Sequence, residues 1–400
     1  MDKSLSDKRD SFVLIFFLGA LTALGPLCND TYSPFLPLIA RSLGALPGQA
    51  QLTMSTILLG FAGGQLVYGP LSDRFGRRPL LLLGLAVFMF ASIGCAFALT
   101  INQLLFGRFL QGFGAAAGMV LSRAIILDRW RGSQASRVLS MVMVIAFFAP
   151  VVAPMLGGWL ATFGHWPIVF WMLALVGAMG VVATLILLPK AGIDRSDVSI
   201  LGSFLAYGEL IRRSEVVGHI FCSGLAMAGV MIFVTGSPFV FIEYFSLAPH
   251  MFGYCFAFVM LGGALGAFLN GRMVVGIGTM KLVSFGTGLI AISSFACFIA
   301  TLMTGNVLGI ILPFCGYLFG VGFVVTNLIT RTLSLYPGQA GAGAALFGVG
   351  QFLMGATAAA VLGLLEVQTP FPLSVSIVIL GPLCALVWWT WLRRLSVSID

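Results

Sequence analysis

The sequence predicts an all-α polytopic membrane protein with twelve transmembrane helices. Three observations predict it: the mean hydropathy of the 400 residues is +1.06, only 8% of them are charged, and the charges leave long apolar runs between them. A soluble domain carries about 25% charged residues, and so few charges could not keep this chain in water. The runs, at about 20 residues each, are too long for the alternating strands of a membrane β-barrel.

Twelve runs are apolar and long enough to cross a bilayer. They cover residues 12–36, 51–71, 79–100, 103–127, 138–160, 166–189, 217–242, 251–271, 282–303, 306–330, 340–365 and 371–392. The first run is too long for the core of a signal peptide, so we expect it to remain as the first span. A longer polar segment separates the sixth run from the seventh. We therefore predict an N-terminal six-helix bundle over 1–189, a cytoplasmic central loop over 190–215 and a C-terminal six-helix bundle over 216–400.

The positive charges orient these spans. With the N-terminus inside, all but two of the 21 Lys and Arg residues fall in the tails, in the even-numbered loops or at inner span ends; the exceptions are Arg41 and Arg108. This distribution obeys the positive-inside rule and predicts that both termini are cytoplasmic. It also explains the net charge of +8 without nucleic acid as a partner. The seven cysteines and three histidines are scattered, and they predict neither disulfides nor a metal site.

The strongest local motif follows span two, from Gly69 to Arg78. Its glycines permit a tight turn, and Asp73 can sit at a helix N-terminus, where the helix dipole favours an anion. Its arginines can pair with Asp128 at the inner end of span four. We predict a cytoplasmic latch that holds one conformation and opens in another; the alternative is a simple positive-inside anchor. The latch residues are Gly69, Asp73, Arg74, Gly76, Arg77, Arg78 and Asp128.

A shorter echo of this motif follows span eight, in residues 270–276. A glycine frame and one arginine recur there, although the acid is lost. Together with the central loop, the echo indicates that the two halves are a duplication. Such halves place a substrate site between them, near the middle of the membrane.

Two ionisable residues lie well inside predicted spans, away from their ends: Asp30 in span one and Arg108 in span four. Each costs at least about 2.5–3.5 kcal/mol to insert, so both are functional candidates. Both lie roughly 7–9 Å from the outer ends of their spans, and we expect them to face one cavity. We predict that Asp30 binds the proton and that Arg108 tunes Asp30, holds water or binds a polar substrate group. The alternative is a static Asp–Arg pair that holds the bundle together.

These segments resemble known families. The Gly69–Arg78 segment resembles the loop motif of the major facilitator superfamily, and residues 108–114 resemble the span-four motif of its drug:proton antiporters. Residues 149–158 resemble the span-five motif of exporters, with Ala153 where that motif usually has glycine. Residues 29–34 and 236–243 resemble the Bcr/CflA group of twelve-span, DHA1-type antiporters.

This resemblance implies the major facilitator fold, alternating access and a bacterial inner-membrane location. It also implies proton coupling, with the proton gradient as the energy source and no cofactor. Some relatives carry a second acid near the middle of span one. Residues 19–25 hold none here, so Asp30 is expected to act alone.

Two further groups of residues are candidates for the transport path. Span five is expected to hinge or seal because proline kinks a helix and glycine permits close packing; simple packing is the alternative. Its residues are Pro150, Pro154, Gly157 and Gly158. Polar and aromatic side chains that could line a substrate cavity are Asn29, Tyr32, Gln65, Tyr68, Gln111, Phe239 and Asn327.

The sequence thus predicts a proton-coupled antiporter that exports amphipathic small molecules, antibiotics among them. The expected partners are a small-molecule substrate, protons and the lipid bilayer, and we expect a monomer. An exporter of a metabolite, such as an amino acid, a small peptide or a siderophore, fits the same residues. Uptake by symport fits the span-five motif less well, and a receptor or scaffold has no need of Asp30 or Arg108. A membrane enzyme would need a nucleophile–base or metal constellation, and the spans show none.

Overall fold

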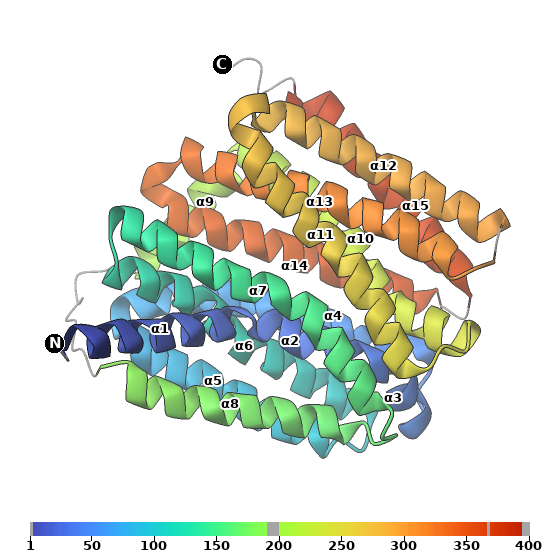
Figure 1. The fold of residues 1–400 in the computed structure, drawn as a ribbon, viewed down its shortest axis with the longest axis horizontal. Helices are drawn as coiled ribbons and strands as arrows, with labels where there is room; N and C mark the ends of the chain where they lie inside the picture. The colour runs from blue at the N-terminus through green and yellow to red at the C-terminus, as the bar shows by residue number, and fades with distance from the viewer. Residues whose placement is uncertain (1–2, 190–199, 304, 366–368, 394–400) are drawn as a thin grey trace.

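The long helices lie side by side and form one bundle. The structure, a computed structural model, describes residues 3–189, 200–303, 305–365 and 369–393. Figure 1 shows the helices of the first half of the chain, blue to green, running alongside those of the second half, yellow to red. The described residues form helices and connectors without a strand, which confirms the all-α prediction.

The first half of the chain forms α1 to α8. Their bounds are α1 Lys3–Thr22, α2 Leu24–Asp30, α3 Leu36–Ser42, α4 Pro47–Phe75, α5 Arg77–Ala96, α6 Ile101–Arg129, α7 Gly132–Ala161 and α8 Pro167–Leu187. A 3-10 turn, η1 (Ser33–Phe35), joins α2 to α3. The helix α7 continues without a break through its two prolines.

The second half forms α10 to α15 and is preceded by a short helix, α9. The bounds are α9 Ile200–Ile211, α10 Ser214–Pro238, α11 Pro249–Ile277, α12 Thr279–Met303, α13 Leu308–Leu335, α14 Ala340–Leu364 and α15 Pro370–Val387. Two π-helical turns, η2 (Phe239–Tyr244) and η4 (Trp388–Leu392), extend α10 and α15, and a 3-10 turn, η3 (Pro337–Gln339), precedes α14.

The described residues contain eleven helices that are long and apolar enough to cross a membrane. A twelfth span results if the pair Phe12–Thr22 and Leu24–Ser42, bent by 44°, is counted as one. The prediction of twelve spans is confirmed in this form. The first span was expected to end near residue 36, but its helical path continues to Ser42, so Asp30 lies deeper within it than the sequence suggested.

The two halves repeat the same local geometry, as the echo predicted. Gly76 ends α4 with φ 90° and ψ 154°, and Gly278 ends α11 with φ 88° and ψ 151°. The equivalent of Gly76 is therefore Gly278, two residues beyond the segment that the sequence suggested. Close packing repeats as well: Gly60 of α4 lies against the carbonyl of Phe109, and Gly262 of α11 lies against that of Cys315.

The halves meet tightly at one end, which we call the outer end because the charge pattern predicts it to face outward. Gly158 of α7 packs against the carbonyl of Pro249, and Gly253 of α11 packs against the carbonyl of Pro154. The indole Nε1 of Trp159 also donates a hydrogen bond to the Tyr254 hydroxyl at 3.0 Å. Side chains at these glycines would collide with backbone, so the glycines are what permit closure here.

A second contact between the halves runs along α4 and α14. Gly363 packs against Gly48 at the outer end, Gly355 lies near Leu58, and Gly348 lies against the Gln65 side chain. Between them, the rings of Phe61 and Phe352 meet with centroids 5.1 Å apart. The two helices are therefore antiparallel partners over most of their length.

The helix α9 falls in the segment that the sequence predicted to be a loop. Its Tyr207 and Leu210 are buried in a small apolar cluster with Val216 and Leu346. Residues 190–199 of the expected loop lie outside the described residues. Residues 200–211 are an apolar sequence of helical length flanked by charged residues.

Candidate functional site

Asp30 is the last residue of α2 and is only 6% exposed. The amide nitrogen of Asn29 donates a hydrogen bond to its Oδ1 at 3.0 Å. Within the described chain, no basic nitrogen lies within 4.0 Å of the Asp30 carboxylate, as the three ion pairs present all lie elsewhere. A buried carboxylate with no cation beside it is chemically suited to accept a proton.

Arg108 is fully buried in α6 and forms a network with spans one and three. Its Nη1 donates hydrogen bonds to the Cys28 carbonyl at 3.1 Å and to Gln111 Oε1 at 2.6 Å. Its guanidinium lies 4.0 Å from the centre of the Tyr32 ring, a cation–π contact. Gln111 in turn donates to the Ser92 hydroxyl at 2.8 Å.

Asp30 and Arg108 share a depth but do not meet, and this corrects both the expected common cavity and the static pair. Arg108 contacts Cys28 and Tyr32, which lie on one face of the first span because they are four residues apart. Asp30 lies midway between them in sequence and therefore on about the opposite face of the helix. In this conformation the first span separates the carboxylate from the guanidinium.

The seven cavity candidates do not gather at one place. Tyr32 and Gln111 belong to the Arg108 network, and the Tyr32 hydroxyl also bonds Thr53 Oγ1 at 2.7 Å. Asn29 bonds Asp30. The remaining four lie elsewhere: Gln65 at the α4–α14 contact, Tyr68 buried against the Phe113 ring, Phe239 buried at the start of η2, and Asn327 hydrogen-bonded to Asn270 at 2.6 Å.

The largest effect on stability in this network is expected from Gln111→Leu. This change removes an acceptor from a buried cation, so we expect the free energy of unfolding to fall by about 2 kcal/mol. Adding Arg108→Met to the same protein removes the buried charge and should restore most of the loss. Thermal unfolding in detergent measures both, with Arg129→Met, at the exposed inner end of α6, as the control. A double variant no more stable than Gln111→Leu would contradict the network.

The latch residues come together at the inner end of the first half. Arg77 bonds Asp73 Oδ1 at 2.5 Å, Asp128 Oδ2 at 3.0 Å and the Ser72 hydroxyl at 2.6 Å. The predicted pairing with Asp128 is thus present, and Arg77 makes it. All of these groups belong to α4, α5 and α6, so the network braces one half rather than joining the two.

The other latch residues lie on both sides of the turn at Gly76, in α4 and α5. Arg78 Nη2 donates to the Leu185 carbonyl at 3.0 Å, and Arg74 contacts the Phe75 ring at 5.6 Å. Gly69 lies against the hydroxyl of Tyr207 from α9. Burial and the nearby negative charge of Asp73 raise the pKa of Tyr207 to about 12, so its hydroxyl stays protonated.

The expected position of Asp73 at a helix N-terminus is wrong. Asp73 lies in the last turn of α4, because that helix continues through Phe75 until the positive φ of Gly76 ends it. Its charge is balanced by Arg77, four residues ahead, rather than by a helix dipole.

The span-five residues pack where the outer end closes. Gly157 lies against the backbone of Thr31, next to Asp30, and Gly158 lies against the second half. The Pro154 carbonyl meets Gly253, and Pro150 is half-buried one turn further in. This geometry supports a seal at the outer end.

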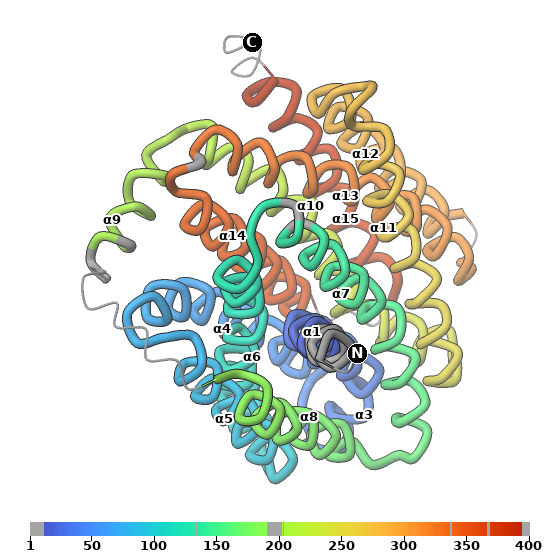
Figure 2. Tube along the Cα trace, turned by 60° about the vertical axis from the view of Figure 1, so that its left-hand side comes forward, coloured from blue at the N-terminus to red at the C-terminus, as the bar shows by residue number. Residues whose placement is uncertain are grey.

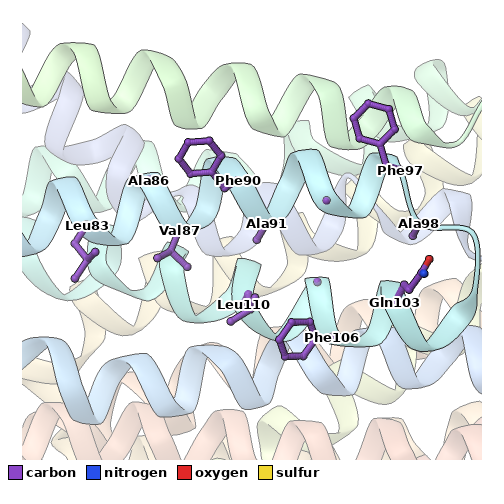
Figure 3. A pocket seen from close by; sticks show the side chains of 12 residues that line it. Leu83, Ala86, Val87, Phe90, Ala91, Phe97, Ala98, Gln103, Phe106 and Leu110 are labelled. Carbon is purple, nitrogen blue, oxygen red and sulfur yellow. The ribbon is translucent and has the colours of Figure 1, made fainter.

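An open groove of about 770 Å³ lies on the outside of the bundle, and Figure 3 shows Val87 and Ala91 across from Leu110 and Phe106. Its walls are apolar except for Gln103. None of the seven cavity candidates lines it, so it does not serve as their substrate site.

The sequence did not predict two partners of Arg108, the Cys28 carbonyl and the Met54 sulfur, 3.9 Å from Nη2, nor Ser92, the acceptor of Gln111. Ser92 offered a signal, because it is a hydroxyl inside an apolar run. A backbone carbonyl and a methionine sulfur offer none.

Comparisons with known proteins point to one family of transporters. The family model described as Major Facilitator Superfamily matches residues 15–359. An uncharacterized MFS-type transporter, YdgK of Bacillus subtilis, is 32% identical and covers 90% of both chains. A bicyclomycin resistance protein homolog of Haemophilus influenzae is 28% identical over 92% of this chain and 93% of its own. The multidrug resistance protein MdtL of Shewanella oneidensis is 28% identical over 87% and 88%.

The fold is also found among solved structures. The xylose transporter XylE of E. coli, in a partially occluded inward open conformation, superposes with a TM-score of 0.76 over 95% of this chain and 97% of its own. The identity is 14%, so this likeness concerns the fold alone.

Proposed function

Because the chain belongs to the major facilitator superfamily, we propose that it is a proton-driven exporter of amphipathic small molecules, antibiotics among them. The chain is a multi-pass membrane transporter rather than an enzyme. Relatives named for bicyclomycin and multidrug resistance support drug export. The observation that carries proton coupling is Asp30, a buried carboxylate inside the first span without an ion-pair partner among the described residues.

The proposed cycle is antiport by alternating access. When the transporter is open to the outside, a proton binds Asp30 and displaces the substrate to the outside. When the transporter is open to the inside, the proton is released inside. Gly157, packed against Thr31, puts the outer seal beside Asp30, so opening that seal would change the hydration of the carboxylate. Arg108, held by Gln111 and Cys28, is available to position a polar group of the substrate or water rather than to neutralise Asp30.

The remaining parts of the proposal follow the topology. We propose two six-helix bundles over 1–189 and 216–400, a location in the bacterial inner membrane, cytoplasmic termini, a monomer, and the proton gradient as the energy source in place of a cofactor. The charge pattern supports the orientation.

Inside-out vesicles test export and substrate class together. With an acid interior imposed, addition of an amphipathic antibiotic is expected to cause proton efflux and uptake of the antibiotic into the vesicles. A response to one amino acid, peptide or siderophore, with none to antibiotics, would favour the metabolite exporter instead. From vesicles loaded with the antibiotic beforehand, its exit together with protons would contradict antiport.

The latch predicts a difference between two neighbouring arginines. Arg77→Gln removes contacts to Asp73, Asp128 and Ser72, whereas Arg74→Gln removes only a contact to the Phe75 ring. Because conformational coupling is typically worth about 5–150-fold, we expect Arg77→Gln to slow transport at least fivefold and Arg74→Gln to have little effect. Initial rates of export at matched expression measure both. Equal effects of the two changes would support the simple anchor.

A further inference from the structure

The helix α9 has two apolar faces, and the protein covers only one of them. Tyr207 and Leu210 are buried against the spans. Phe204, Leu205 and Ile211 are 43%, 61% and 54% exposed. Phe204 and Ile211 are seven residues apart and share one stripe of the helix. A surface helix in contact with water on that side would carry polar residues there.

The contacts of α9 place it beside the spans rather than beyond their ends. Leu66, which packs on the α9 cluster, lies roughly 13 Å of helix before α4 ends at Phe75. Leu346, in the same cluster, lies roughly 9 Å of helix after α14 begins. Figure 2 shows α9 at the periphery of the molecule, close to the inner ends of these helices. At that depth, the uncovered side of α9 meets the boundary between acyl chains and headgroups.

The end of α9 carries two arginines and, near them, the acids Glu209 and Glu215. Arg212 and Arg213 follow the helix and are exposed, and the Arg213 guanidinium lies 5.9 Å from the centre of the Tyr336 ring. The nearest acid on this helix, Glu209, accepts a hydrogen bond from Gln339 Nε2 at 2.6 Å. Two arginines beside an apolar stripe match an anionic phosphate above acyl chains.

We propose that α9 is an interfacial helix that docks on the inner leaflet and binds an anionic phospholipid. Phe204, Leu205 and Ile211 enter the acyl boundary, and Arg212 and Arg213 bind the headgroup phosphate. The helix touches α4 of the first half and both α10 and α14 of the second, with the Tyr207 hydroxyl against Gly69 of the latch motif. A lipid bound to α9 is therefore positioned to influence both halves.

Brominated lipids test the docking directly in reconstituted full-length protein. Phe204→Trp adds one tryptophan to the seven present, and the unsubstituted protein in the same liposomes gives the background. We expect the added emission to be quenched by bromine near the headgroup end of the acyl chains, more strongly in phosphatidylglycerol than in phosphatidylcholine. Phe90→Trp, on an exposed position of α5, is the control for lipid contact without arginines.

The second arm tests the headgroup. Combining Phe204→Trp with Arg212→Gln and Arg213→Gln is expected to lower the preference for the anionic lipid by about fivefold per arginine. Added emission that iodide in water quenches and that neither brominated lipid quenches would overturn the docking. Equal quenching by the two lipids before the arginines are replaced would overturn the anionic headgroup.

Discussion

Replacing Gly158 by leucine is expected to stop transport without unfolding the protein. A side chain at this position would collide with the Pro249 carbonyl and the His250 backbone, so the halves could no longer close at the outer end. Overpacking costs about 1–3 kcal/mol, which shifts an equilibrium between two conformations by about 5–150-fold. The expected result is loss of export with the protein held open outward. Export rates, together with distances between spin labels at the outer ends of α5 and α11, measure it.

The matched control is Gly94→Leu. A Cβ at Gly94 meets nothing within 4 Å, and this glycine lines the apolar groove on the outside of α5 and α6. Its substitution should leave export and thermal stability unchanged. Full export by Gly158→Leu, or equal loss in both variants, would contradict the role of Gly158 in the seal.

Asp30→Asn is expected to abolish proton-driven export while leaving substrate binding in place. Asparagine has nearly the same shape as aspartate and can still bond Asn29, but it cannot take up or release a proton. Glu243→Gln is the matched control, because Glu243 is exposed and its Oε1 lies 3.7 Å from Arg41 Nε at the outer end. Export driven by a pH gradient should vanish in Asp30→Asn and persist in Glu243→Gln. Gradient-dependent export by Asp30→Asn would show that the coupled proton binds at another residue.

Much of the fold could be predicted because the bilayer imposes it. Spans need apolar runs of known length, and arginine and lysine placement orients them, so the helices α4 to α8 and α10 to α15 follow from the sequence. The Arg77–Asp128 pair was also predictable, since both groups lie at the inner ends of neighbouring spans. The bend of the first span also had a signal in the sequence, because Pro26 follows the break at Ala23 by three residues and proline kinks a helix.

The site was less predictable than the fold. Sequence gives the depth of Asp30 and Arg108 but not the rotation of each helix about its own axis, because the first span is apolar almost all round. Asp30 is two residues from Cys28 and from Tyr32, which both contact Arg108. In a helix two residues turn a side chain to about the opposite face, so Asp30 points away from Arg108. The helix α9 escaped prediction because at 12 residues it is too short for a span and stands among charges.

Substrate-induced proton release from purified protein tests the central claim, that one proton-binding carboxylate is coupled to export. In weakly buffered detergent solution with a pH indicator, saturating antibiotic should release protons from the unsubstituted protein and none from Asp30→Asn. The same release from both proteins, or none from a protein that binds the antibiotic, would contradict the account.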